Sequence, residues 1–91
     1  MPIVMVSHAP SRDLYEQVAA EAHIDADRPD GLIIHTASET ADGRVRIVDV
    51  WESEQHVEEF ERARLIPAFE AIGAPGGPPQ REITEPFNII R

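Results

Sequence analysis

Three side chains suited to chemistry fall in one stretch between Gly31 and Ser53: His35, Asp49 and Trp51. A histidine that an aspartate holds and orients is a common general base. A tryptophan offers a flat apolar wall on which an aromatic ligand can stack. The same three residues also fit a structural interpretation, with a buried His–Asp hydrogen bond and a core tryptophan. The sequence leaves both interpretations open.

The turn inside this stretch decides whether His35 and Asp49 can meet. Asp42-Gly43 lies between two apolar runs and is a strong signal for a β-hairpin. A two-residue Asp42-Gly43 loop would place His35 and Asp49 on opposite faces of the hairpin, whereas a three-residue loop that adds Ala41 sets them directly opposite each other. We favour the three-residue loop, because glycine suits its last position and because Asp49 then gains a partner for its charge.

Three further residues are candidates to bind a substrate: His8, Tyr15 and Phe60. His8 ends the first apolar run and could point into the same pocket as His35. Tyr15 and Phe60 belong to amphipathic segments, where they either pack in the core or line a pocket between helix and sheet. No pair of histidines has the i, i+4 spacing of a helical metal site, so we expect no metal.

The hydrophobic pattern predicts the element order β-α-β-β-α-β. The predicted strands are Pro2–His8, Leu32–Ser38, Val45–Trp51 and Gln80–Arg91; the predicted helices are Arg12–His23 and a segment from Ser53 to Gly73. Pro67 should end or kink the second helix near Leu65, Ala74–Pro79 should be a loop, and Pro86 should break the last strand or mark it as an edge strand. This order is typical of an α+β, ferredoxin-like fold with a four-stranded antiparallel sheet and both helices on one face.

The second face of this sheet also needs cover. The first strand is apolar at nearly every position from Ile3 to Val6, and the second is apolar from Leu32 to Ile34. Two helices cover only one face, and the shortest route to burying the other is a second copy of the sheet. We therefore expect a homodimer that forms through sheet faces.

Length and charge restrict the class of protein. The 91 residues form one domain, residues 1–91, with a small core. The net charge of −9 argues against a nucleic-acid partner, because phosphate binding needs clustered basic residues. No apolar run approaches the ~20 residues that span a bilayer, and no signal peptide is evident. With no cysteine in the chain, a cytoplasmic protein without disulfides is the default expectation.

Three segments carry a family resemblance: Gly31 to Ala37 (GLIIHTA), Val48 to Ser53 (VDVWES), and the helix that contains Phe60 and Leu65-Ile66-Pro67. In these segments and in its layout the chain resembles the dimeric α+β barrel superfamily. Within that superfamily it is most similar to small proteins of the antibiotic-biosynthesis-monooxygenase type. The Trp-Glu-Ser that joins the third strand to the second helix is the most recognisable part.

The resemblance implies a pocket inside each subunit, between sheet and helices, and a dimer barrel built by the opposite sheet faces. Members include cofactor-independent monooxygenases of quinols and polyketide aromatics, haem-degrading enzymes, and small proteins with no known activity. Trp51 matches a tryptophan that lines the pocket in some members. Ser7 and His8 stand where family oxygenases often have an asparagine, which weakens the case for haem degradation and quinol oxidation.

Two functions of different class follow from these patterns. The first is a monooxygenase without cofactor, or a cyclase or isomerase, that acts on a planar aromatic or polyketide-type small molecule, with His35 and Asp49 as catalytic residues. The second is a non-catalytic dimer that binds a small ligand or takes part in stress. Haem binding through a histidine is a third, less favoured possibility.

Overall fold

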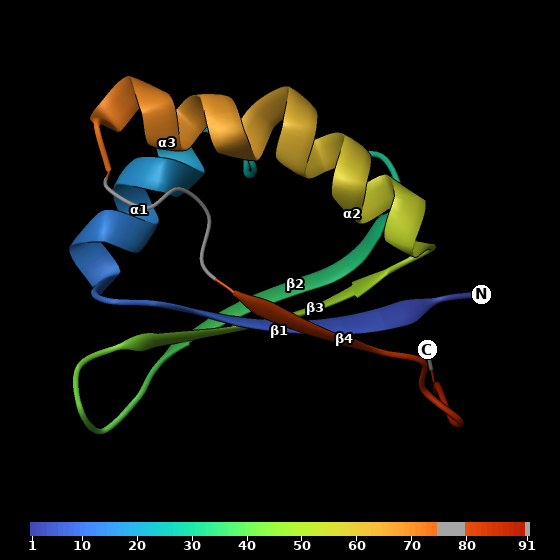
Figure 1. Ribbon diagram of the computed structural model, residues 1–91. Coiled ribbons are helices and arrows are strands. Elements are labelled where there is room, and N and C mark those ends of the chain that lie inside the picture. Colours follow the sequence, from blue (N-terminus) through green and yellow to red (C-terminus); the bar gives the residue numbers. More distant parts are fainter. Residues whose placement is uncertain (75–79, 91) are drawn as a thin grey trace.

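The computed structural model, which describes residues 1–74 and 80–90, places its helices on one face of a single antiparallel sheet (Figure 1). The elements in chain order are β1 (Ile3–Ala9), α1 (Arg12–Glu21), β2 (Leu32–Glu39), β3 (Val45–Trp51), α2 (Glu54–Phe60), the π-helical η1 (Glu61–Leu65), α3 (Ile66–Ile72) and β4 (Arg81–Thr84). The predicted ferredoxin-like α+β fold is confirmed. No helix within these described ranges is long and apolar enough to cross a bilayer.

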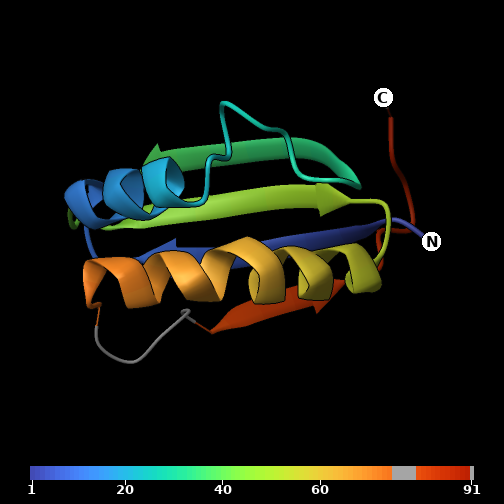
Figure 2. The same ribbon diagram turned by 90° about the horizontal axis from the view of Figure 1, so that it is seen from above.

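The strands lie side by side in the order β2-β3-β1-β4, which Figure 2 shows from the helix side. β1 is a central strand, as its continuous apolar run predicts, and β4 is an edge strand, as Pro86 suggests. Along β1 the residues Ile3, Met5, Ser7 and Ala9 are buried, and they alternate with half-buried neighbours. Because side chains alternate across a strand, this buried set faces the helices and defines the inner face of the sheet.

The β2–β3 hairpin turns through the three-residue loop that the sequence favours. The residues before and after the loop pair with each other, since the Thr40 amide donates to the Arg44 carbonyl at 2.8 Å. Gly43 takes the left-handed conformation at φ +83°, which costs glycine little. This loop sets the register of the hairpin, so that His35 lies opposite Asp49 as predicted.

A β-bulge at the start of β2 changes which side chains face the helices. Leu32 pairs with Trp51 and Ile34 with Val50, so Ile33 is an extra residue in its strand. The extra residue brings Leu32 to the inner face together with His35, three positions away. The Arg28 guanidinium donates to the carbonyls of Leu32 and Ile33 and so satisfies the backbone at this irregular point.

The second helical segment does not end at Pro67, but its regular α-helix is interrupted by the π-helical turn Glu61–Leu65, near where the sequence predicts an end or a kink. It runs through α2, η1 and α3 as one rod over the sheet (Figure 2). Proline cannot donate a hydrogen bond, and its ring conflicts with the carbonyl four residues earlier in an α-helix. The wider π-turn absorbs this conflict: the Ile66 amide bonds to the Glu61 carbonyl, five residues back, directly before Pro67. Ser53 caps the start of α2 and Gly73 ends α3 in the left-handed conformation, both as expected.

The last strand is shorter than predicted. β4 covers Arg81–Thr84, and the described residues beyond it are not in a strand. Pro86 explains the early end, because it lacks the amide that a ladder needs and restricts the residue before it. Phe87 is fully exposed in the single chain. Of the predicted loop Ala74–Pro79, residues 75–79 lie outside the described part of the chain.

Two glycines with the same backbone conformation give a test of this packing. Gly31 and Gly43 have φ angles of +84° and +83°. A Cβ atom added at Gly31 would overlap the His56 ring, whereas a Cβ atom added at Gly43 would have no atom within 4 Å. We expect Gly43→Ala to lower the free energy of unfolding by about 1–2 kcal/mol through backbone strain alone. Gly31→Ala should cost about 1–3 kcal/mol more, because it adds the steric overlap.

Urea unfolding of the two variants measures the difference. The double variant Gly31→Ala/His56→Ala lacks the overlapping ring. Its loss in free energy of unfolding should therefore be close to that of the double variant Gly43→Ala/His56→Ala. Equal losses for the two single variants would show that the His56 ring does not pack on Gly31.

Candidate functional site

His35 and Asp49 meet in the middle of the inner face. They are register partners across β2 and β3, and the His35 Nδ1 atom lies 2.7 Å from the Asp49 carboxylate. Met5 on the central strand β1 flanks Asp49 from the other side. The pair that the sequence proposes as catalytic is therefore formed, on the face that the helices cover.

Asp49 is 4% exposed, so its carboxylate depends on hydrogen bonds for solvation. One oxygen accepts from His35, and the second accepts from the Trp51 indole N–H at 3.3 Å. Trp51 is two residues along the same strand, which puts both side chains on one face. Within the described residues no buried side-chain nitrogen or oxygen lacks a partner.

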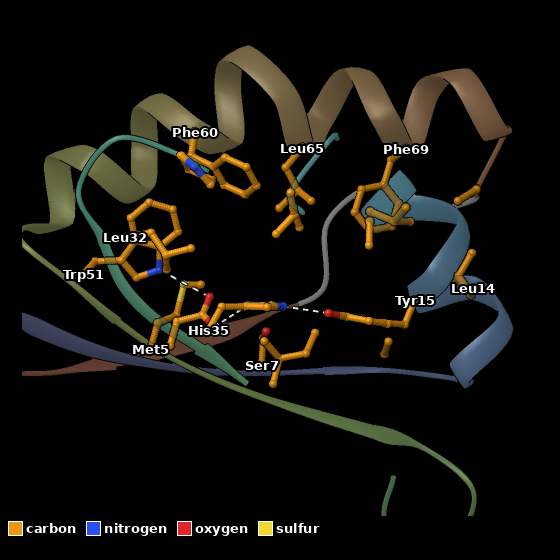
Figure 3. Close-up of a pocket in the computed structure, with 18 of the residues that line it drawn as sticks. Met5, Ser7, Leu14, Tyr15, Leu32, His35, Trp51, Phe60, Leu65 and Phe69 are labelled. Carbon is orange, nitrogen blue, oxygen red and sulfur yellow. Dashed lines mark hydrogen bonds and ion pairs between the residues drawn. The ribbon is translucent and has the colours of Figure 1, made fainter. Parts of the chain in front are cut away.

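Tyr15 extends this arrangement from the helical layer. Its hydroxyl lies 2.6 Å from the other ring nitrogen of His35, Nε2. The planes of the two rings are nearly parallel, with an interplanar angle of 9°. Hydrogen bonds thus run from Trp51 through Asp49 to His35 and Tyr15, and Figure 3 shows the positions of Trp51, His35 and Tyr15 along this line. We call Asp49, His35 and Tyr15 the polar chain.

The polar chain borders a cavity of about 500 Å³ between the sheet and the helices. Apart from the polar chain, most of its wall is apolar, and Leu14, Leu65 and Phe69 come from the helical layer (Figure 3). Small-molecule sites typically have ~300–1,000 Å³ of volume and a few convergent polar groups in an apolar wall. The cavity has the size and the lining of a site for a mostly apolar ligand.

Ser7 is a polar cavity residue that the sequence analysis did not propose as a site. It faces inward from β1, is 8% exposed and lines the cavity. Figure 3 shows it below the line that joins His35 to Tyr15. The alternation of β1 was a usable signal, because Ser7 is the polar member of the inward set Ile3, Met5, Ser7 and Ala9.

Trp51 and Phe60 lie at one end of the cavity. Their ring centroids are 5.4 Å apart with an interplanar angle of 41°. Trp51 is 1% exposed and packs among the core residues at this end of the cavity. Trp51 thus supports Asp49 and the core and also lines the cavity, and its contact with a ligand stays a prediction. Phe60 is half-buried and lines the cavity, as the sequence allows.

His8 does not join the site, so the expectation that it points into the pocket is wrong. It lies next to the inward-facing Ser7 and Ala9 on β1, pairs with Arg46, and is absent from the cavity wall. Strand parity puts it on the outer face of the sheet. The strand was predicted correctly, but the direction of its alternation could not be read from a run in which both faces are apolar.

The surroundings of the polar chain shift two pKa values upward. The hydrogen bond to Asp49 raises the pKa of His35 above its usual 6.5; burial opposes this, and the aspartate charge adds to it. Burial raises the pKa of the Tyr15 hydroxyl, with smaller contributions from the Asp25 and Asp49 charges. Tyr15 is therefore protonated at neutral pH, while His35 loses its proton at a higher pH than an ordinary histidine does.

The described residues contain no group of three or more histidine, cysteine, aspartate or glutamate side chains arranged for a metal. The hydrogen bonds of His35 also bear on haem binding. Both ring nitrogens of His35 have hydrogen-bond partners within the chain, so neither is free to act as an axial ligand. His8 lies on the other face of the sheet.

Comparison with known proteins identifies the fold. No protein-family model matches the sequence, and no curated protein matches it. Among solved structures, Rv0793 from Mycobacterium tuberculosis has a TM-score of 0.71 at 16% identity and covers 100% of both chains. A putative antibiotic biosynthesis monooxygenase from Chloroflexus aurantiacus J-10-fl has a TM-score of 0.71 at 15% identity, with 100% of this chain and 98% of that chain covered.

SnoaB from Streptomyces nogalater, described as a cofactor-independent oxygenase, has a TM-score of 0.69 at 17% identity and covers 98% of this chain and 96% of that chain. At these identities the likeness establishes the shared fold and does not carry an activity. The resemblance to antibiotic-biosynthesis-monooxygenase-like proteins that the sequence suggests is confirmed at the level of the fold.

The raised pKa of His35 makes the stability of the protein depend on pH. A histidine whose pKa is higher in the folded state contributes stability that is complete below its unfolded value, about 6.5, and is lost as pH rises through the folded value. His35→Asn keeps an N–H near the position of Nδ1 but does not titrate. We expect the stability advantage of the wild type over His35→Asn to shrink as pH rises above about 6.5.

Urea unfolding of both proteins at a series of pH values measures this advantage. An advantage that stays constant, or that grows with pH, would contradict the ion pair between His35 and Asp49.

Proposed function

We propose that the protein is a cofactor-independent monooxygenase-like enzyme that acts on a planar aromatic or polyketide-type molecule in this cavity. The polar chain at the border of an apolar cavity is the observation that carries the proposal. Asp49 orients His35 and stabilises its positive charge, so the imidazole can take a proton from a bound ligand. The shared fold with a cofactor-independent oxygenase supports the same class of reaction.

The chemistry requires only a base, a suitable ligand and dioxygen. Removing a proton from an anthrone or a related phenol gives an electron-rich anion that can reduce dioxygen directly. In the conversion of an anthrone to an anthraquinone, one oxygen atom becomes the new carbonyl and the other leaves as water. Oxidation of the ring methylene supplies all four electrons, so no other reductant takes part. The apolar wall favours a flat ligand and excludes water from the anion.

A second candidate function is ligand binding without catalysis in the same cavity. Its support is the complete pairing of the polar chain, in which every buried polar atom already has a partner, together with the closely packed Trp51. Such an arrangement also suits a rigid binding site. The two functions differ in turnover and not in location.

Oxygen consumption separates these functions. With anthrone as substrate we expect the wild type to consume dioxygen and His35→Asn to be slower by about 100-fold or more, the usual loss when a general base is removed. His23→Asn is the matched control: it removes an exposed imidazole at a left-handed position that asparagine tolerates, and its rate should be unchanged.

An oxygen electrode and the absorbance of the anthraquinone give the two readouts. Equal rates for wild type and His35→Asn would remove His35 from the mechanism. Binding of anthrone without oxygen uptake by the wild type would favour the non-catalytic function.

We also propose that the protein is a homodimer through the outer face of its sheet. None of the described elements covers that face (Figure 1). Its centre is apolar and only half-buried, with Val6 on β1 beside Val48 on β3, and Ile34 is 49% exposed. An apolar sheet face and the exposed ring of Phe87 gain most by contacting a second copy of themselves.

A charge on this face should separate the subunits. We expect the wild type to sediment at twice the mass of one chain and Val48→Glu to sediment as a monomer, because the carboxylate would be desolvated in the interface. Ala63→Glu adds the same charge on the exposed side of η1 and should leave the dimer intact. A monomeric wild type, or a dimeric Val48→Glu, would contradict the proposed interface.

A further inference from the structure

The polar chain leaves His35 with no free ring nitrogen. Nδ1 lies 2.7 Å from Asp49 and Nε2 lies 2.6 Å from the Tyr15 hydroxyl. A ligand in the cavity therefore reaches the imidazole only by displacing Tyr15 or by acting through it. Tyr15 itself is half-buried and lines the cavity, and its hydroxyl ends the polar chain, so a ligand in the cavity can meet it there.

The direction of each hydrogen bond follows from Asp49. An ionised carboxylate only accepts, so His35 must donate from Nδ1. In the neutral imidazole Nε2 is then the acceptor, and the Tyr15 O–H donates to it. The remaining lone pairs of the Tyr15 oxygen are free to accept a hydrogen bond from a ligand hydroxyl.

We propose that the Tyr15 hydroxyl is the group that exchanges a proton with the ligand, and that His35 and Asp49 act through it. This inference rests on the proposed function and names the atom that carries it out. The ligand class is correspondingly narrow: a flat, mostly apolar molecule with an acidic phenol or enol hydroxyl directed at Tyr15.

The proton transfer is balanced by the residues of the polar chain alone. The ligand O–H gives its proton to the Tyr15 oxygen, and in the same step the original Tyr15 proton moves to Nε2 of His35. One O–H bond of the ligand breaks, one N–H bond forms, and Tyr15 stays neutral. The products are a ligand anion and an imidazolium whose charge Asp49 stabilises. A neutral intermediary suits a hydroxyl whose pKa burial has raised, because free phenolate is never required.

Tyr15→Phe separates the relay from direct proton removal by His35. The substitution deletes one oxygen atom and leaves Nε2 open to the cavity. With anthrone, whose enol tautomer anthrol carries the required hydroxyl, the relay predicts a fall in kcat of about 100-fold or more, similar to His35→Asn. The double variant should be no slower than the slower single variant, because both act in one step. A Tyr15→Phe rate equal to or above that of the wild type would overturn the relay.

A second readout does not depend on oxygen chemistry. In the absence of dioxygen, the absorbance of para-nitrophenol reports how much of the bound probe is ionised. We expect the wild type to raise the ionised fraction above that in buffer at the same pH, and both Tyr15→Phe and His35→Asn to abolish the increase. Ser38→Ala, which removes an exposed hydroxyl from the same strand as His35, serves as the control and should behave as the wild type.

The two measurements fail in different ways. A wild type that ionises the probe through Tyr15 but consumes no oxygen would refute the monooxygenase and keep the relay. No rise in ionisation with the wild type, or the same rise with Tyr15→Phe, would overturn the relay whatever the oxygen measurement gives.

Discussion

The buried carboxylate of Asp49 is the constraint on which the rest of the site depends. A charge at 4% exposure on an apolar sheet face is tolerated only with strong partners, and two side chains provide them. Trp51 holds one oxygen and His35 the other, which fixes the imidazole in one orientation. Tyr15 then satisfies the far side of the ring. The need to stabilise one buried carboxylate thus fixes the positions of the side chains from Trp51 in the core to Tyr15 at the cavity.

The sequence predicts the fold and the central pair because local signals set both. Alternating and helical hydrophobic periods give the element order, and the glycine of the hairpin loop sets the register. His35 and Asp49 are fourteen positions apart, and the turn between them sets the register that brings them together. The alternation of side chains along β1 could also have identified Ser7 as a cavity residue, because it is the polar member of the inward-facing set.

The features that the sequence does not predict are those that depend on tertiary packing. Tyr15 is twenty positions from His35, and only the placement of α1 over the sheet brings them together. The bulge at Ile33 shifts side chains by one position without a clear local signal, whereas Pro67 signals an irregularity near Leu65 but not that it is a π-turn. The outward direction of His8 was hidden by a strand that is apolar on both faces. Such irregularities determine the wall of the cavity, whereas regular elements determine the fold.

The central claim is that Asp49 fixes the neutral His35 in the tautomer that carries its proton on Nδ1. Nitrogen-15 NMR of the histidine rings, recorded above the pKa of His35, measures this directly. The predicted spectrum has a protonated Nδ1 and an unprotonated, hydrogen-bonded Nε2 that loses its hydrogen-bond shift in Tyr15→Phe. A proton on Nε2 in the neutral ring, or a spectrum that Tyr15→Phe leaves unchanged, would contradict the polar chain as the basis of function.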